Sequence, residues 1–233
     1  MRKLLFVIPI IMLIGCKTED EFSCGTETVT YQSQEYNTVQ IGDQCWLKEN
    51  LNVGEMIPGT TEQSDNGILE KYCYENSPDS CAKYGGLYQW DEMMQYTTTP
   101  GVQGICPPGW HLPTDEEWKV LEGAVDSQYG IGDPVWDNEG FRGYDAGKNL
   151  KTTSGWNENG NGTDLFSFSG LPGGFRIDDT DFGYVGYFNH LWTSTKGNVG
   201  YAWYRNLEYF NVGVNRSFTP KENGFSVRCL RDE

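Results

Sequence analysis

The sequence is poor in positive charge, in histidine and in long hydrophobic runs. Its 17 lysine and arginine residues stand against 33 aspartate and glutamate residues, giving a formal net charge of −16. Such a charge repels polyanions, so we expect no nucleic-acid partner and no binding to anionic lipid headgroups. With only two histidines, His111 and His190, and no CxxC pair, the chain lacks the ligand pattern of a zinc site. Phosphate-binding and dinucleotide-binding glycine motifs are also missing, so we expect no organic cofactor.

One hydrophobic run is present, at residues 4–14, directly after two basic residues. It is too short to cross a membrane as a helix and has the length of a signal-peptide core. We therefore interpret residues 1–15 as a signal peptide. Residues 13–16, Leu-Ile-Gly-Cys, resemble the lipobox of bacterial lipoproteins, which implies that Cys16 becomes the first residue and carries acyl chains. The alternative is an ordinary secretory signal followed by a spare cysteine.

Residues 16–23 are then the lipidated cysteine and a short acidic tether. Two or three acyl chains give durable membrane attachment, since each buried methylene contributes about 0.8 kcal/mol. Lys17, rather than an acid, follows Cys16, which fits export beyond the inner membrane, and the acidic residues after it resemble surface-export signals of some bacterial lipoproteins. We expect an outer-membrane lipoprotein of the cell envelope that contacts the membrane through its lipid, with residues 24–233 forming one domain.

The chain is organised around residues 106–118, CPPGWHLPTDEEW. Prolines and a glycine exclude regular structure as far as Pro113, and Thr114 and Glu117 then stand at capping-box spacing, which predicts the start of a helix. Positions i, i+3 and i+7 of that helix form one apolar face, and we expect its acidic residues to point outward. The apolar residues are Trp118, Leu121 and Val125, and the acidic residues are Asp115, Glu116 and Glu122.

This stretch resembles the signature of the Fibrobacter succinogenes major paralogous domain, a family of bacterial lipoproteins. Four further groups of residues resemble the same family in the same order: 38–51, 73–90, 154–164 and 224–229. The family fold is similar to those of C-type lectins and formylglycine-generating enzymes. The resemblance implies an α+β, C-type lectin-like fold with a twisted antiparallel sheet, two short helices, long loops and disulfide braces.

Six cysteines remain after Cys16, and an even number in an exported domain indicates disulfides, although six cysteines allow fifteen connectivities. Two pairs are local: Cys73 and Cys81 flank a short loop, and Cys24 and Cys45 flank an expected strand pair. Cys106 is then left with Cys229. This long bridge resembles the one that clamps the C-terminal strand of C-type lectin-like domains.

The pattern of side chains predicts several elements. Residues 28–31 and 36–41 are β-branched and aromatic and are separated by a polar turn, which predicts a hairpin. Leu87, Trp90 and Met94 have helical spacing and predict the first helix, and the segment after Thr114 predicts the second. Beyond Ser127 we find no further helix signal.

A glycine- and asparagine-rich loop at residues 155–164 carries oxygen atoms of the kind that bind Ca²⁺. Such a loop is more often a simple turn, and its spacing is not that of an EF-hand. The sugar-binding triplets of calcium-dependent C-type lectins do not occur in the sequence, so that mechanism is not transferred, and Cys229 stands alone where formylglycine-generating enzymes have a reactive pair. The candidate calcium ligands are Asn157, Glu158, Asn159, Asn161 and Asp164.

Residues 176–215 are the aromatic-rich part of the chain, and we predict that they form a recognition face. Exposed tyrosine and tryptophan offer large contact areas at a small cost in entropy, whereas ordinary sheet packing is the alternative explanation. Strand alternation would place one of Trp203 and Tyr204 outside. The candidate ligand-binding residues are Tyr184, Tyr187, Tyr201, Trp203, Tyr204 and Tyr209, and among these Tyr201, Trp203 and Tyr204 lead.

Together these features predict a non-catalytic lipoprotein that binds a polysaccharide or another envelope or extracellular protein. The alternative is an extracellular enzyme that acts on glycans, or an oxidase similar to formylglycine-generating enzymes. A glycan hydrolase would need a pair of carboxylates such as Asp178 and Asp179, whose separation in space the sequence does not give.

Overall fold

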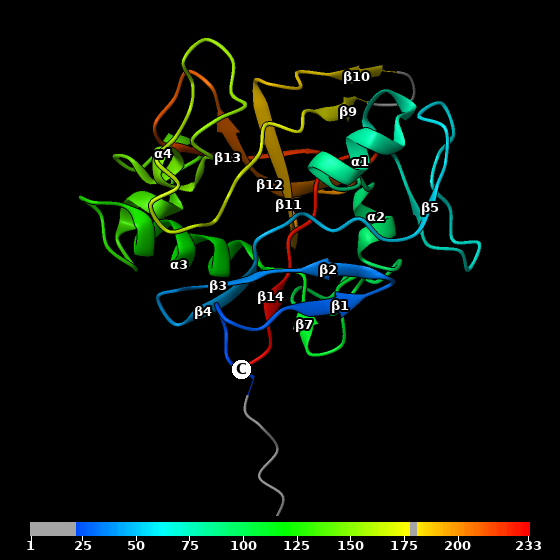
Figure 1. Cartoon of the computed structure of the whole chain (residues 1–233), viewed down its shortest axis with the longest axis horizontal. Helices are drawn as coiled ribbons and strands as arrows, with labels where there is room; N and C mark the ends of the chain where they lie inside the picture. The colour runs from blue at the N-terminus through cyan, green and yellow to red at the C-terminus, as the bar shows by residue number, and fades with distance from the viewer. Residues whose placement is uncertain (1–21, 178–180) are drawn as a thin grey trace, which may run out of the picture.

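The computed structural model describes residues 22–177 and 181–233 (Figure 1). The predicted signal peptide, Cys16, most of the tether and the Asp178/Asp179 pair lie outside the described residues. Within the described part of the chain, no helix combines the length and the apolar character needed to cross a membrane. The described chain begins and ends at the same end of the molecule, where the Arg231 guanidinium lies 4.5 Å from the centre of the Phe22 ring.

The lower sheet in Figure 1 is antiparallel and has the strand order β3-β4-β14-β7. Its strands are β3 (Thr38–Ile41), β4 (Gln44–Leu47), β7 (Trp110–His111) and β14 (Leu230–Arg231). Leu230 pairs with Trp46 on one side and with His111 on the other. The C-terminal strand therefore joins two segments from the first half of the chain.

A hairpin forms here, but its second strand lies earlier in the chain than predicted and shares only Tyr36 with the predicted strand. Strands β1 (Val29–Tyr31) and β2 (Gln34–Tyr36) pair with each other, whereas β3 pairs with β4. Asn37 separates β2 from β3, and its backbone N–H donates to the Glu49 carboxylate at 2.8 Å. The prediction of one continuous strand over residues 36–41 is wrong, because Tyr36 pairs with β1 whereas residues 38–41 pair with β4.

The upper sheet has the order β11-β12-β13-β8, with every pair antiparallel. Its strands are β8 (Gly140–Arg142), β11 (Phe188–Lys196), β12 (Tyr201–Glu208) and β13 (Val214–Pro220). Two small sheets pair β9 (Phe175–Ile177) with β10 (Asp181–Gly183), and β5 (Glu55–Met56) with β6 (Glu70–Lys71). The β5–β6 pair is parallel, and the other sheets are antiparallel. The fold is mixed α+β, with mainly antiparallel sheets, few helices and long loops.

The helix predicted after Thr114 is α3 (Asp115–Val125), and its capping box is complete. The other predicted helix is wrong. A single turn, α2 (Trp90–Met93), covers part of its range, and α1 (Pro78–Tyr84) lies before it. Gly85, with φ of 85°, ends α1, and Leu87 then forms a β-bridge to Tyr72 instead of continuing a helix.

Three further pieces of helix have no signal in the sequence: two follow Ser127 and one precedes α1. Helix α4 (Ala146–Leu150) has only five residues, too few to show an amphipathic pattern, and η1 (Tyr74–Asn76) and η2 (Pro134–Asp137) are 3₁₀ turns. The described residues thus contain four α-helices rather than the two expected.

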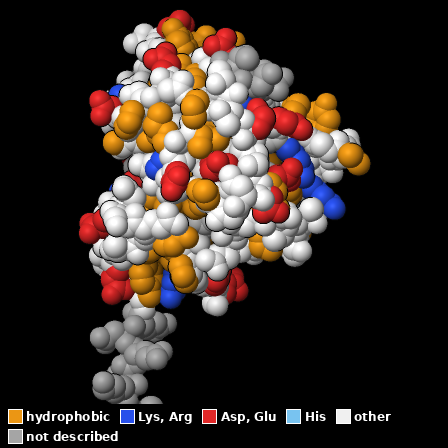
Figure 2. All heavy atoms as spheres, turned by 90° about the vertical axis from the view of Figure 1, so that its right-hand side faces the viewer, with side chains coloured by type: hydrophobic (Ala, Val, Ile, Leu, Met, Phe, Trp, Pro, Cys, Tyr) orange, Lys and Arg blue, Asp and Glu red, His pale blue; other side chains and the backbone are white. Residues whose placement is uncertain are grey.

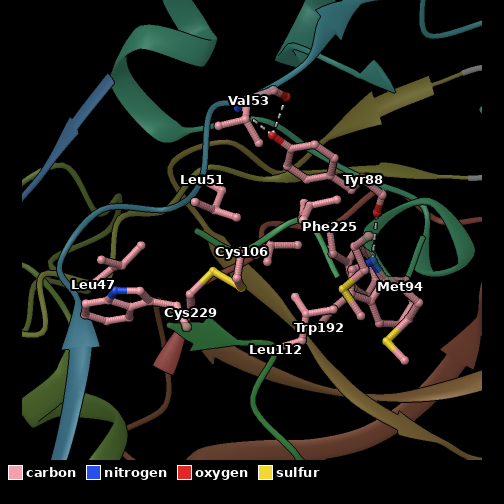
Figure 3. Close-up of a cluster of buried hydrophobic side chains, with 14 of the residues drawn as sticks. Leu47, Leu51, Val53, Tyr88, Met94, Cys106, Leu112, Trp192, Phe225 and Cys229 are labelled. Atoms are coloured by element: carbon pink, nitrogen blue, oxygen red, sulfur yellow. Dashed lines mark hydrogen bonds between the residues drawn. A yellow bond between two sulfur atoms is a disulfide. The ribbon is translucent and has the colours of Figure 1, made fainter. Parts of the chain in front are cut away.

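Two hydrophobic clusters fill the interior. One surrounds the Cys106–Cys229 bridge and includes Trp192, whose indole N–H donates to the Tyr88 carbonyl at 2.8 Å (Figure 3). The other lies between α3 and the two main sheets, where the Trp46 and Trp118 rings are 5.0 Å apart. The predicted apolar face of α3 is confirmed, since all three of its residues are buried in this second cluster.

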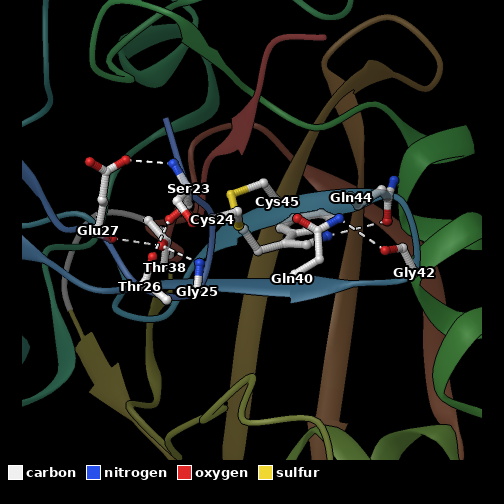
Figure 4. The surroundings of a disulfide bond; sticks show 11 residues. Ser23, Cys24, Gly25, Thr26, Glu27, Thr38, Gln40, Gly42, Gln44 and Cys45 are labelled. Carbon is white, nitrogen blue, oxygen red and sulfur yellow. Dashed lines mark hydrogen bonds between the residues drawn. A yellow bond between two sulfur atoms is a disulfide. The ribbon is translucent and has the colours of Figure 1, made fainter. Parts of the chain in front are cut away.

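Three disulfides join Cys24 to Cys45, Cys73 to Cys81 and Cys106 to Cys229, the pairing expected from the sequence. Figure 4 shows the first of these, which ties the start of the described chain to β4. All six cysteines of the described residues are bonded, so this part of the chain offers no free thiol.

The acids of α3 do not all point outward, and this is the largest correction to the sequence interpretation. Glu116 is exposed, but Asp115 and Glu122 are buried in a chain of ion pairs with the upper sheet. Glu122 binds both Arg142 of β8 and Arg205 of β12. Arg205 continues to Asp115 at 2.7 Å, and Asp115 also binds Arg216 of β13 at 2.8 Å. Two carboxylates and three guanidiniums therefore hold α3 against the sheet.

The charge environment of Asp115 follows from this arrangement. Burial by itself would raise its pKa, but hydrogen bonds and charges from the neighbouring arginines outweigh burial and lower the pKa to about 2. Burial lowers the pKa of Arg142 to about 10, which still leaves it charged at neutral pH.

Candidate ligand-binding site

Strand alternation divides the predicted aromatic residues between the two faces of the upper sheet. In β12, Tyr201 and Trp203 share a face with Arg205, which points at α3. Ala202 and Tyr204 lie on the other face, where Tyr204 packs against Trp192 and Phe225. The three leading candidates therefore do not form one surface.

Trp203 has a structural contact that the sequence does not reveal. The Arg216 guanidinium lies 3.8 Å from the centre of its ring, so Trp203 covers the end of the buried ion-pair chain. Trp203 and Tyr204 are both half-buried, and the expectation that one of them is exposed is wrong. Tyr201 is 40% exposed and contacts Phe218 on the α3 side of the sheet.

Five other rings form a continuous row around one end of the upper sheet, which we call the aromatic ribbon. Successive ring centres are 4.9 to 6.5 Å apart. The exposed fractions of Tyr184, Phe210 and Phe141 are 51%, 61% and 40%. In order, the members of the ribbon are Tyr184, Phe188, Tyr209, Phe210 and Phe141.

Two predicted residues, Tyr184 and Tyr209, thus belong to the ribbon, and Tyr187 supports it through an edge contact with Tyr209 at 5.1 Å. Phe141, Phe188 and Phe210 were not among the candidates, although Phe188 and Phe210 lie within residues 176–215. Phe141 comes from β8, outside the aromatic-rich segment, and reaches the ribbon because β8 pairs with β13. Phe141 could not be recognised from the sequence because it is far from the other ribbon residues along the chain.

Polar side chains lie beside the ribbon on the Tyr204 face. Strand pairing places His190 opposite Asn206, and Asn206 opposite Asn215. Within the described residues, Nδ1 of His190 and Oδ1 of both asparagines are buried without a hydrogen-bond partner. A buried unpaired polar atom costs about 1–3 kcal/mol, so an internal water molecule bonded to these atoms would be stabilising.

Burial shifts the pKa values of the titratable groups on this face. Burial lowers the pKa of His190 to about 3, so its ring is neutral. Burial also raises the pKa of Glu208, although a hydrogen bond from Asn215 and the charge of Lys151 oppose the change. The side-chain amide of Asn206 donates to Glu208 at 2.6 Å. The face combines neutral acceptors and one carboxylate with aromatic rings.

A buried lysine holds the turn that carries two ribbon residues. The Lys151 ammonium donates to the carbonyls of Glu208 at 2.7 Å and Asn211 at 3.0 Å. Its burial lowers the pKa of Lys151 to about 8. These bonds fix the turn at Tyr209 and Phe210, and no sequence signal pointed to Lys151.

The candidate calcium loop lies next to this turn. Gly160 packs against the backbone of Tyr209, and Asn157 and Glu158 are exposed with Asn159. The Asn161 side-chain oxygen accepts from the Trp156 N–H at 3.0 Å, and Asp164 accepts from Ser169 at 2.7 Å. The oxygens of Asn161 and Asp164 thus stabilise the loop itself. Over residues 22–177 and 181–233, no group of three histidine, cysteine, aspartate or glutamate side chains is arranged to hold a metal.

Most of the chain matches the model of a known protein family. The model of the Fibrobacter succinogenes major domain matches residues 39–231. The chain belongs to this family. No curated protein and no solved structure matches it. The Fibrobacter succinogenes major domain thus spans the lower sheet except Thr38, the upper sheet and the whole aromatic ribbon.

Proposed function

We propose that this protein is a non-catalytic binding lipoprotein of the outer membrane whose aromatic ribbon binds a polysaccharide. The observation that carries the proposal is the ribbon itself, five contiguous rings of which three are exposed. Aromatic rings stack on the apolar faces of sugars, and exposed rings are free to do so. An extended row of rings fits a polymer better than a compact small molecule.

We further propose that the fold is C-type lectin-like. The long Cys106–Cys229 bridge, the C-terminal strand in the lower sheet and the close approach of the two ends of the described chain support this assignment. No catalytic role is proposed, because a lectin-like face with stacking rings binds without a nucleophile. The acidic side chains are spread over the face seen in Figure 2 rather than gathered in one place, which fits a role in solubility.

The binding proposal is tested with the full chain in detergent on an array of neutral polysaccharides. Removing one exposed ring of the ribbon, by Phe210→Ala or Tyr184→Ala, should weaken binding about fivefold, because one stacked ring contributes about 1 kcal/mol. Tyr201→Ala is the matched control, since Tyr201 is also an exposed tyrosine but lies on the opposite face of the sheet.

Equal losses in all three variants would place the site elsewhere, and unchanged binding in the two ribbon variants would reject the ribbon. Release of shorter glycans during incubation would reject the non-catalytic assignment.

The anchor is tested separately. Metabolic labelling with an acyl-chain analogue should mark the wild-type protein, and Cys16→Ala should abolish the label. Equal labelling of both proteins would rule out lipidation at this cysteine.

A further inference from the structure

Four asparagine residues of this chain are followed directly by glycine, and such a pair can rearrange without an enzyme. The backbone nitrogen of the glycine attacks the side-chain carbonyl carbon of the asparagine, and glycine permits this approach because it has no Cβ. A succinimide ring forms, and water then opens it. The four pairs are Asn66-Gly67, Asn159-Gly160, Asn161-Gly162 and Asn223-Gly224.

The fold engages the attacking N–H in three of these pairs. Each of the three N–H groups donates to a backbone carbonyl at 2.8 to 3.0 Å, and this hydrogen bond must break before the nitrogen can lose its proton. Gly160 and Gly224 are buried as well. The three bonds run from Gly160 to Asn157, from Gly162 to Thr152 and from Gly224 to Arg176.

Gly67 has a different environment. Its N–H has no hydrogen-bond acceptor among residues 22–177 and 181–233, and both Asn66 and Gly67 are exposed. Apart from the two adjacent residues, no atom lies within 4 Å of the place where a Cβ would stand at Gly67. A base from the solvent can therefore reach this nitrogen and take its proton.

The side chain of Asn66 is held by the turn that follows it. Its oxygen accepts from the Ile68 N–H at 2.8 Å, and its NH₂ group donates to the Glu70 carboxylate at 3.2 Å. Negative charge develops on the side-chain oxygen when a nitrogen adds to the carbonyl carbon, and the Ile68 N–H is a donor to that charge. The turn thus polarises the amide that neighbours the unprotected nitrogen.

We propose that Asn66 is a site of spontaneous deamidation in the folded protein, whereas the other three asparagines are protected. The Gly67 nitrogen gives its proton to the solvent and bonds to the Asn66 side-chain carbon. The bond from that carbon to the amide nitrogen breaks, and the nitrogen takes a proton from the solvent and leaves as ammonia. One water molecule then opens the ring at either carbonyl, which gives aspartate or isoaspartate.

The modification changes the contacts of residue 66. A carboxylate replaces the NH₂ group that donates to Glu70, so two negative groups face each other. Glu70 is the first residue of β6, and its carboxylate also accepts from the Ser64 N–H at 3.1 Å. Deamidation therefore loosens the segment that leads into β6. This effect is independent of the aromatic ribbon.

The test is an incubation of the full chain in detergent in mildly alkaline buffer, followed by digestion at acid pH and mass spectrometry. Exchange of NH₂ for OH changes the mass of each deamidated peptide, and fragmentation of the backbone distinguishes isoaspartate from aspartate. The same incubation in denaturant with reductant is the control, because the four pairs then differ only in local sequence.

In the folded protein we expect Asn66 to deamidate about tenfold faster, or more, than each of the other three asparagines, because their N–H groups react only after local opening. In denaturant we expect the four rates to lie within about threefold of one another. Similar rates at all four sites of the folded protein, or a faster rate at one of the three bonded sites, would overturn the proposal. An equal preference for Asn66 in denaturant would assign the preference to local sequence and would also overturn it.

The loosening of the segment before β6 is tested by amide hydrogen exchange. Asn66→Asp carries one of the two products from the start, and exchange at residues 64–70 should be about threefold faster, or more, than in the wild type. Asn159→Asp is the matched control, because Asn159 is also exposed and precedes a glycine, and it should leave exchange at residues 64–70 unchanged. Equal exchange in Asn66→Asp and the wild type would overturn the proposed loosening.

Discussion

Removing the charge of Glu122 is the sharpest test of how α3 is held. Glu122 is wholly buried and binds two guanidiniums, those of Arg142 and Arg205. Glu122→Gln keeps the shape of the side chain but leaves one carbonyl oxygen to accept from two guanidiniums. The NH₂ group of the glutamine then faces the other guanidinium, so two donors face each other. Leaving a buried charge without its partner costs about 3–5 kcal/mol. We therefore expect a loss of this size in the free energy of unfolding.

The measurement is chemical and thermal unfolding without reductant. For a domain of this length, 3–5 kcal/mol corresponds to a decrease in Tm of about 6 to 20 °C. Glu116→Gln is the matched control on the same helix, because Glu116 is exposed and its one ion pair among the described residues is with Lys119 at 2.8 Å. Surface pairs of this kind contribute less than about 1 kcal/mol, so the control should unfold almost like the wild type.

A double-mutant cycle separates lost pairing from lost packing. Arg142→Met removes one of the two guanidiniums, so the combined Glu122→Gln/Arg142→Met variant should lose less stability than the two single losses added together, by about 0.5–3 kcal/mol. Additive losses, or a Glu122→Gln protein as stable as the Glu116→Gln control, would refute the reasoning that the ion-pair chain holds α3 to the sheet.

Two other predictions concern the bridges and pH. Replacing Cys106 and Cys229 by alanine should lower the free energy of unfolding by about 4–5 kcal/mol, because this bridge closes a loop of 123 residues. Replacing Cys73 and Cys81 should lower it by about 2–3 kcal/mol, because their bridge closes a loop of only 8 residues. Equal losses in denaturant titrations would contradict this loop-length argument. Burial opposes protonation of His111, but two flanking carboxylates outweigh burial and raise its pKa above 6.5. Protonated His111 therefore stabilises the folded protein fully below pH 6.5, and this stabilisation is lost as the pH rises through the raised pKa. The stability difference between wild type and His111→Gln should therefore shrink as the pH rises from 6.5 through the raised pKa, and a difference that grows would show that the sign is wrong.

Local signals in the sequence led to correct local structure. The capping box at Thr114 and Glu117 and the apolar face of α3 depend on residues a few positions apart. Interactions of such short range are the same in any tertiary context, so the printed order of residues is enough to predict them. The first predicted helix failed because apolar spacing near Trp90 was interpreted without the glycine that ends α1.

The candidate site was predicted only in part, because some of its residues are far apart along the chain. Tyr184 and Tyr209 were recognised from their aromatic-rich surroundings, but Phe141 joins them through the pairing of β8 with β13, across more than 60 residues. Alternation correctly placed Trp203 and Tyr204 on opposite faces. It could not tell which face meets α3, because that depends on what packs against each side.

The sequence alone was enough to predict the family, the three cysteine pairs, the acidic character and the position of α3, because each depends on residue types and their spacing along the chain. The tertiary structure alone decided that Asp115 and Glu122 are buried and that five rings form a ribbon. An acid on a helix faces water unless arginines from elsewhere surround it, and Arg142, Arg205 and Arg216 come from three different strands. Their meeting with α3 is a property of the packed sheet.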